Sequence, residues 1–132
     1  MRTKTRVSAI IISNDQLLLI HRKKGGKEYW VFPGGGVEEG ETNEQAIIRE
    51  MKEETSLDME NARFAFGDPI KWDWGENIFY YGDVKFAEPE LGGPEKLKLS
   101  EKDWYQPEWV KLSKIKDLEI YPEEGKKRLL EQ

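Results

Sequence analysis

The chain has 132 residues, a length that fits one domain with one hydrophobic core. Hydrophobic residues make up 37% and charged residues 36%, and five Trp, five Tyr and five Phe supply enough apolar surface to exclude a disordered chain. The net charge of −5 argues against general nucleic-acid binding, which depends on clustered Lys and Arg. We therefore expect a single globular domain over residues 1–132.

No membrane partner is expected, because the longest apolar runs, residues 7–12 and 17–20, are far shorter than the ~20 residues of a membrane helix. The basic residues 1–6 precede a β-branched stretch without a small-residue cleavage site, which favours a first strand over a signal peptide. The chain has no cysteine, which suits a reducing compartment, and we expect a cytoplasmic protein.

The N-terminal third is expected to form strands. Two apolar runs, residues 3–12 and 16–22, flank a turn composition and predict a β-hairpin. A short strand at Tyr29 to Phe32 should end at Pro33, which cannot donate to a ladder. The three glycines that follow, residues 34–36, permit positive φ and predict a turn or loop.

A helix is predicted next. Thr42 and Gln45 have the Ser/Thr-x-x-Glu/Gln spacing of a capping box, so the helix should run from Thr42 to about Thr55. At 100° per residue, one flank suited to packing carries Ile47, Ile48 and Met51. The neighbouring flank carries Glu50, Glu53 and Glu54.

Beyond the helix, residues 61–74 and 77–86 predict two aromatic-rich strands. Residues 87–103 read as a long loop, and residues 107–112 as a further strand. A terminal helix is expected over residues 121–131. The order of three strands, a helix, three strands and a helix predicts an α+β fold with an α/β/α layered arrangement.

Three glutamates at positions i, i+3 and i+4 repel one another by ~0.2–0.5 kcal/mol per pair. A bound Mg²⁺ would offset this repulsion, because the ion prefers carboxylate oxygens. The alternative is a solvated acidic face, which is common on helices and would be favoured for the glutamates alone. An ordinary turn would likewise be favoured for the glycines alone.

Residues 35–57 together read GGVEEGETNEQAIIREMKEETSL and resemble the Nudix box, in which glycine, glutamate and Arg-Glu positions have fixed spacing. Ser56 stands where the family has its final glycine. Residues 30–35 and 109–112, with Pro122 beyond, are also similar to the family. The positions in register are Gly35, Glu41, Arg49, Glu50, Met51, Glu53, Glu54 and Leu57.

The resemblance implies a Nudix-type α/β/α sandwich, with the helix of the box packed on a mixed sheet. It implies hydrolysis of a nucleoside diphosphate linked to another group, by attack of water on phosphorus, with Mg²⁺, or Mn²⁺ in its place, as cofactor. The bound cation would also reverse the repulsion between an acidic protein and a polyphosphate. The implied metal ligands are Glu50, Glu53 and Glu54, with the carbonyl of Gly35 or Gly36.

Two further roles follow from the resemblance. Arg49 is expected to orient Glu41 or Glu50 through an ion pair, the alternative being a surface arginine without a special role. The general base is expected to be Glu50 or Glu53. A fourth acidic group can come from the 87–103 loop, where the candidates are Glu95 and Glu101, although most loop glutamates are merely solvated.

Further candidates lie outside residues 35–57. Arg22 and Lys23, at the end of a predicted strand, are placed to reach substrate phosphates or, alternatively, to be a solvated pair. A lone His21 favours a strand residue over a metal ligand or base. Aromatic residues that can stack on a base, or belong to the core, are Trp30, Trp72, Trp74 and Tyr81.

Two other functions stay open besides hydrolysis of a small nucleotide. One is a nucleotide-sensing domain that binds without cleavage. The other is a decapping-type pyrophosphohydrolase for RNA ends, which the negative charge disfavours. We expect a small nucleotide-like substrate and a monomer or homodimer.

Overall fold

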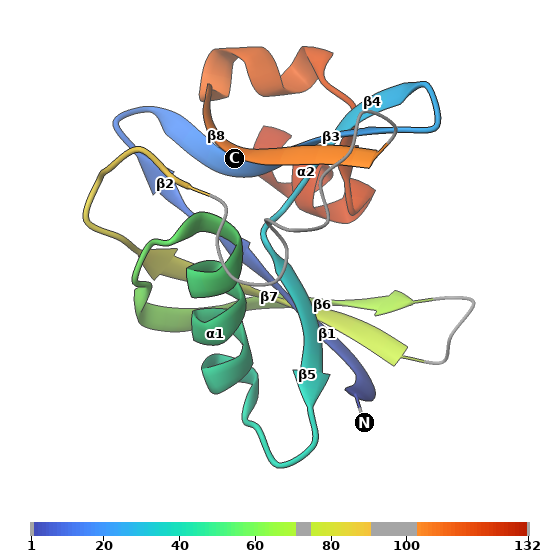
Figure 1. Cartoon of the computed structure of the whole chain (residues 1–132), viewed down its shortest axis with the longest axis vertical. Coiled ribbons are helices and arrows are strands. Elements are labelled where there is room, and N and C mark those ends of the chain that lie inside the picture. The colour runs from blue at the N-terminus through green and yellow to red at the C-terminus, as the bar shows by residue number, and fades with distance from the viewer. Residues whose placement is uncertain (1, 71–74, 91–102, 132) are drawn as a thin grey trace.

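The computed structural model describes residues 2–70, 75–90 and 103–131, which form two sheets and two α-helices (Figure 1). The first sheet has the strand order β5–β1–β7–β6 and the second the order β2–β3–β4–β9, with β8 on the other side of β3. The strands of the first sheet are β1 (Arg2–Ile10), β5 (Gly34–Glu38), β6 (Glu60–Ile70) and β7 (Gly75–Asp83). Those of the second are β2 (Ile12–Ser13), β3 (Gln16–Lys24), β4 (Lys27–Val31), β8 (Asp103–Lys111) and β9 (Ile120–Tyr121).

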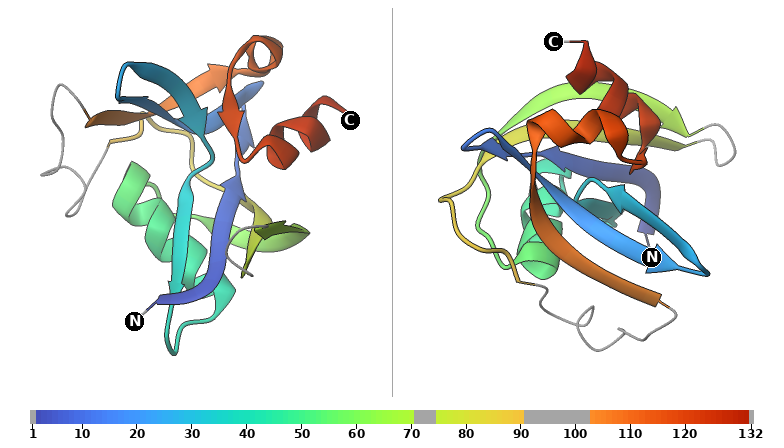
Figure 2. Two further views of the ribbon diagram at one scale, coloured as in Figure 1. Left: turned by 90° about the vertical axis from the view of Figure 1, so that its right-hand side faces the viewer. Right: turned by 90° about the horizontal axis from the view of Figure 1, so that it is seen from above.

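The first sheet is mixed and is covered by a helix on each face. Its strand β1 runs antiparallel to β5 and parallel to β7. The helices are α1 (Asn43–Thr55) and α2 (Glu123–Leu130), and a 3₁₀ helix, η2, covers Leu112–Asp117. Figure 2 shows α1 and α2 on either side of β1 and β5. The expected α+β fold, an α/β/α sandwich, is therefore confirmed.

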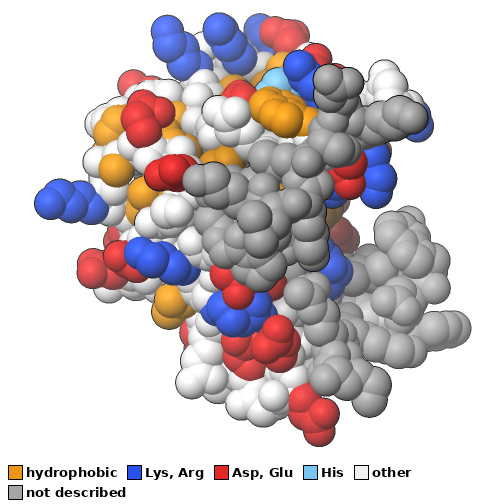
Figure 3. Space-filling model, in the orientation of Figure 1, with side chains coloured by type: hydrophobic (Ala, Val, Ile, Leu, Met, Phe, Trp, Pro, Cys, Tyr) orange, Lys and Arg blue, Asp and Glu red, His pale blue; other side chains and the backbone are white. Residues whose placement is uncertain are grey.

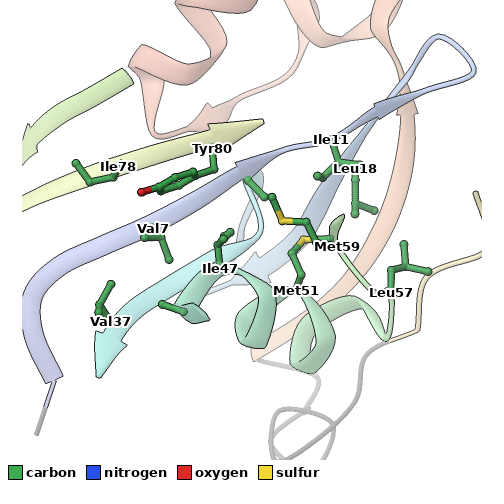
Figure 4. Packing of buried hydrophobic residues seen from close by; sticks show 12 residues of the cluster. Val7, Ile11, Leu18, Val37, Ile47, Met51, Leu57, Met59, Ile78 and Tyr80 are labelled. Carbon is green, nitrogen blue, oxygen red and sulfur yellow. The ribbon is translucent and has the colours of Figure 1, made fainter. Parts of the chain in front are cut away.

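Alternation along β1 builds the two cores. Val7 and Ala9 pack with Ile47 and Met51 of α1, as Figure 4 shows for the labelled side chains. Ile10 faces the opposite side, into a cluster that joins both sheets, η2 and α2 and includes Leu17, Leu19, Phe32, Phe66, Phe79, Ile115 and Ile120. The second sheet thus packs on the face of the first sheet that α1 does not cover, and Leu18 of β3 also joins the cluster around α1.

The predicted N-terminal hairpin is wrong for most of its length. Of the residues before the turn, only Ile12 and Ser13 form ladder pairs with β3. In the turn between them, Asn14 and Asp15 have φ of 52° and 61°. The chain leaves the first sheet after Ile10 and enters the second, so β1 pairs with β5 and β7 instead of β3. Such a change of partner depends on long-range pairing, which the local turn composition does not report.

The three glycines form the strand β5 and not a loop. Gly34 lies opposite Ser8 and Gly35 opposite Val7 in the antiparallel pair with β1. A Cβ on Gly34 would overlap the carbonyl oxygen of Val7. Glycine is therefore required here for a close approach of two strands.

The capping box is confirmed. Thr42 Oγ1 accepts from the Gln45 backbone N–H at 3.1 Å, and Gln45 Oε1 accepts from the Thr42 N–H at 2.9 Å. The predicted packing flank is partly wrong, because Ile47 and Met51 are buried but Ile48 is 43% exposed. The buried face is rotated towards the acidic flank and includes Glu50, so α1 turns that flank to β5.

The remaining elements differ from the predictions mainly in their ends. The strand predicted at residue 107 begins at Asp103, and η2 was not predicted. The terminal helix begins at Glu123 with Pro122 as its N-cap residue. Part of the predicted long loop, residues 91–102, lies outside the described residues. Among the described helices, none is long and apolar enough to cross a membrane.

Replacing Met51 by Ala tests the packing of α1 on the first sheet. Met51 is fully buried, so the variant should lose about 2–5 kcal/mol of unfolding free energy through lost transfer energy and a cavity. Ile48→Ala on the same helix is the matched control, and its exposed side chain should change stability by less than about 0.5 kcal/mol. Urea unfolding measures both, and equal losses would contradict the packing described.

Candidate active site

The guanidinium of Arg49 is the centre of a charged cluster beside β5. Its Nε donates to Glu41 Oε2 at 2.7 Å and its Nη2 donates to Glu41 Oε1 at 3.0 Å, so the ion pair with Glu41 is bidentate. Its Nη1 donates to Glu50 Oε1 at 3.0 Å, and Nη2 also donates to the Gly36 carbonyl at 3.1 Å. Glu53 Oε2 lies 3.5 Å from Nη1. The resemblance predicts an ion pair of Arg49 with Glu41 or with Glu50, and the structure contains both.

The cluster keeps Arg49 protonated. The hydrogen bond to Glu41 is the largest cause that raises the pKa of Arg49 above its ordinary value, and Glu50 adds to it, whereas burial acts in the opposite direction. The guanidinium is therefore a permanent positive charge that holds two carboxylates in one orientation. Figure 3 shows acidic and basic side chains side by side over this part of α1.

Glu50 is buried against the backbone of β5. A Cβ on Gly35 would lie 2.5 Å from the Glu50 carboxyl carbon. Gly35 therefore leaves the space that the carboxylate occupies, and Arg49 holds the carboxylate there. The glycine and the glutamate, 15 positions apart in the sequence, fit each other sterically.

Glu54 connects the helix to the same strand. Its Oε1 accepts a hydrogen bond from the Gly34 backbone N–H at 2.7 Å. Glu54 and Gly34 also line a cleft between the two sheets. Glu54 therefore brings a carboxylate from the acidic flank of α1 to the edge of a cavity.

The donor chemistry fits Mg²⁺, although the carboxylates do not converge on one point. Glu50, Glu53 and Glu54 offer only oxygen atoms, which a hard divalent cation prefers. Within residues 2–70, 75–90 and 103–131, no group of three or more Asp, Glu or His side chains is arranged to hold a metal ion. Glu50 and Glu54 instead contact neighbouring residues of β5, Gly35 and Gly34. A metal at these positions therefore belongs to the proposal below.

The cleft has a volume of about 420 Å³. Arg22 of β3 lines it, with Nη2 3.1 Å from Asp103 Oδ1 and the guanidinium 5.2 Å from the centre of the Tyr105 ring. The adjacent Lys23 lies instead over the ring of Trp104, at 5.1 Å. Successive strand residues point to opposite faces, so only Arg22 of the two candidates lines the cleft.

His21 lies on the other face of the second sheet. Its ring nitrogens are 2.8 Å from Glu108 Oε2 and 2.7 Å from Glu28 Oε2, and its ring stacks on Trp30 at 4.4 Å. His21 is therefore a strand residue, as predicted. Trp30, a candidate for stacking on a base, stacks on His21 instead. Tyr81 packs against the core between the sheets. The candidates that lie outside the described residues are Trp72, Trp74, Glu95 and Glu101.

Several cleft residues were missed in the sequence. They are the polar or aromatic residues Arg6, Ser8, Asn77, Asp103, Tyr105 and Tyr121. Ser8 interrupts an otherwise apolar run, and Asn77 opens the apolar stretch of β7. Those interruptions were the available signal, but the pairing of the two strands was needed to place them together.

A family model described as NUDIX domain matches residues 2–130, which is nearly the whole chain. An RNA pyrophosphohydrolase of Psychromonas ingrahamii is 44% identical over 54 residues, which are 41% of this chain and 30% of that protein. An RNA pyrophosphohydrolase of Acinetobacter baylyi is 46% identical over 48 residues, 36% of this chain and 29% of that protein. The chain thus spans less than a third of the length of these relatives.

Solved structures show the same fold. A MutT NUDIX hydrolase from Burkholderia pseudomallei superposes with a TM-score of 0.69 at 24% identity, over 97% of this chain and 95% of that one. A structure from a study of MutT from Aliivibrio salmonicida and Vibrio cholerae gives a TM-score of 0.72 at 23% identity, over 97% and 96%. Since the family model extends over residues 2–130, the chain belongs to the Nudix domain family.

Proposed function

We propose that the protein hydrolyses a diphosphate bond in a nucleoside diphosphate linked to another group, such as a nucleoside triphosphate, with Mg²⁺ as cofactor and Mn²⁺ as its substitute. One observation carries the proposal: α1 holds Glu50 and Glu54 against the backbone of Gly35 and Gly34, at the edge of a cleft. Membership of the Nudix family supports it, because Nudix hydrolases generally use divalent metals.

In this proposal Glu50, Glu53 and Glu54 hold the metal, with the Gly35 carbonyl as a further oxygen ligand. The Gly36 carbonyl is less suited, because it accepts from Arg49. A bound metal ion would neutralise phosphate charge and lower the pKa of a bound water. Arg49 positions Glu50, and Glu41 in turn positions Arg49 by accepting two of its hydrogen bonds.

We assign the general base to Glu53 in preference to Glu50. The Glu50 carboxylate is buried between Gly35 and Arg49. The Glu53 side chain is 34% exposed and makes a longer contact with Arg49, at 3.5 Å. A base must reach the attacking water, and the more open carboxylate has that access. Arg22, on the cleft wall, is the proposed contact to substrate phosphates.

The setting of the activity is also proposed. We propose one domain over residues 1–132, a cytoplasmic location and a monomer or homodimer that acts on a small nucleotide-like substrate.

A second candidate is removal of pyrophosphate from RNA 5′ ends. The relatives named RNA pyrophosphohydrolase favour it, with 44% and 46% identity over the matched segments. The net charge of −5 weighs against an extended RNA contact. Release of pyrophosphate from a 5′-triphosphorylated RNA oligomer, compared with the free nucleoside triphosphate under matched conditions, decides between the two substrates.

Glu53→Gln and Glu54→Gln should each lower kcat by about 100-fold or more, because a carboxamide neither carries the ligand charge nor takes a proton. Phosphate and pyrophosphate release over a nucleotide panel measures the effect. Glu44→Gln is the control on the same helix, since its amide oxygen can still accept from Tyr80. Wild-type rates in both site variants would overturn the assignment, and tight nucleotide binding without turnover by the wild type would favour a sensing domain.

Metal removal should abolish the activity. A chelator is expected to stop turnover, and excess Mg²⁺ to restore it. Because an ion that binds only the folded state stabilises it, Mg²⁺ at 100 times its dissociation constant should add about 2.7 kcal/mol to the unfolding free energy. Thermal unfolding with and without Mg²⁺ measures this gain, which should shrink in Glu54→Gln and persist in Glu44→Gln. A metal-independent rate would contradict the proposal.

Arg49→Lys keeps the charge but cannot donate to Glu41, Glu50 and Gly36 together. We expect kcat to fall about 10- to 100-fold, with a smaller change in KM, because Glu50 loses its orientation. Arg63→Lys is the control, since Arg63 makes exposed contacts to Asp83 and the Asn61 carbonyl. Equal kinetics for the two variants would show that Arg49 is an ordinary surface arginine.

A further inference from the structure

Two buried polar side chains lie on the floor of the cleft. Ser8 of β1 is 5% exposed and Asn77 of β7 is 6% exposed, and both line the cleft between the sheets. They occupy the face of the first sheet that also carries the apolar Ile10 and Phe79. Burying an amide costs free energy unless its hydrogen bonds are made. The Asn77 carboxamide is therefore expected to have hydrogen-bond partners.

Ser8 fixes the orientation of the Asn77 carboxamide. Ser8 Oγ donates to Asn77 Oδ1 at 2.9 Å, across two neighbouring parallel strands. A carboxamide has one acceptor oxygen and an NH₂ group with two donors. With Oδ1 engaged by Ser8, no hydrogen bond of Nδ2 is found among the described residues. Asn77 Nδ2 therefore offers two N–H donors to a ligand in the cleft.

The rest of the cleft suits a flat ring. Ile20, Val31 and Phe32 provide apolar wall, and Tyr105 and Tyr121 line it with aromatic rings. The volume of about 420 Å³ lies within the usual range for a small-molecule site. Gly34 and Glu54 line the same cleft, so a ligand whose phosphates lie at the acidic flank of α1 can place its base against Asn77.

We propose that Asn77, oriented by Ser8, is a specificity-determining residue that donates a hydrogen bond to a keto oxygen of the substrate's base. The inference rests on the proposed function for its phosphate end and adds the class of base. Bases with a keto group at the paired position are favoured over bases with an amino group there, because an amino group would bring donor against donor and leave buried polar groups unpaired.

Matched nucleotide pairs test this preference. Inosine and adenosine triphosphates differ at position 6, and uridine and cytidine triphosphates at position 4, by keto against amino groups. We expect kcat/KM to favour the keto member of at least one pair by roughly tenfold. Binding of inosine and adenosine monophosphates, measured by calorimetry without metal, should show the same order and needs no turnover.

Variants separate base recognition from a purely structural pair. Asn77→Leu should bring the keto-to-amino ratio to about one, and Asn77→Asp, which accepts where Asn77 donates, should reverse it. Ser8→Ala should reduce the ratio, because the carboxamide can then rotate and exchange the positions of its oxygen and nitrogen. Ser113→Ala, an exposed serine of η2, is the control and should leave the ratio unchanged. Circular dichroism checks that each variant folds. If the Asn77 variants do not fold, the keto-to-amino ratio of Ser8→Ala tests the inference.

The outcomes distinguish the two proposals. Monophosphate binding with keto preference but no hydrolysis would uphold this inference and overturn the proposed activity. Hydrolysis with equal kcat/KM for both members of each pair would overturn the inference and leave the activity standing. The inference also fails if neither monophosphate binds, or if the folded Asn77 variants keep the wild-type ratio.

Discussion

The close approach of α1 to β5 is the constraint on which the rest of the site depends. Gly35 has no side chain, so the Glu50 carboxylate can lie against its backbone, and Glu54 accepts from the Gly34 N–H. Arg49 closes the arrangement by binding Glu41, Glu50 and the Gly36 carbonyl. Carboxylates that repel one another along the helix are thereby held next to a strand, at the cost of burying charge.

The same strand links the acidic helix to the cleft. Gly34 pairs with Ser8 of β1, and Ser8 in turn contacts Asn77 of β7. The spacing between the carboxylates and the cleft floor is therefore set by backbone pairing within one sheet. Sites built on strands and helices hold their geometry more closely than sites built on loops, which would suit the proposed binding of a phosphate group and a base at the same time.

Local signals were sufficient for α1, and they failed where distant segments meet. The capping box and the glutamate spacing predict the helix and its acidic flank, since both depend on residues within four positions. Nothing local reports that Arg2–Ile10 pairs with β7, about 70 residues away, instead of with its neighbour β3. The rotation of α1 that exposes Ile48 and buries Glu50 follows from the space that Gly35 leaves, which is a tertiary effect.

Charge explains why the proposed site would need a cation. The chain is acidic overall, and Arg49, the cation within the cluster, already serves Glu41 and Glu50. On the cleft wall, Arg22 is paired with Asp103. Glu53 and Glu54 would therefore repel a polyphosphate that approaches this flank of α1. A divalent ion bound between the carboxylate oxygens and the phosphate oxygens would convert this repulsion into attraction. The acidic flank of the helix and a negatively charged substrate are then compatible.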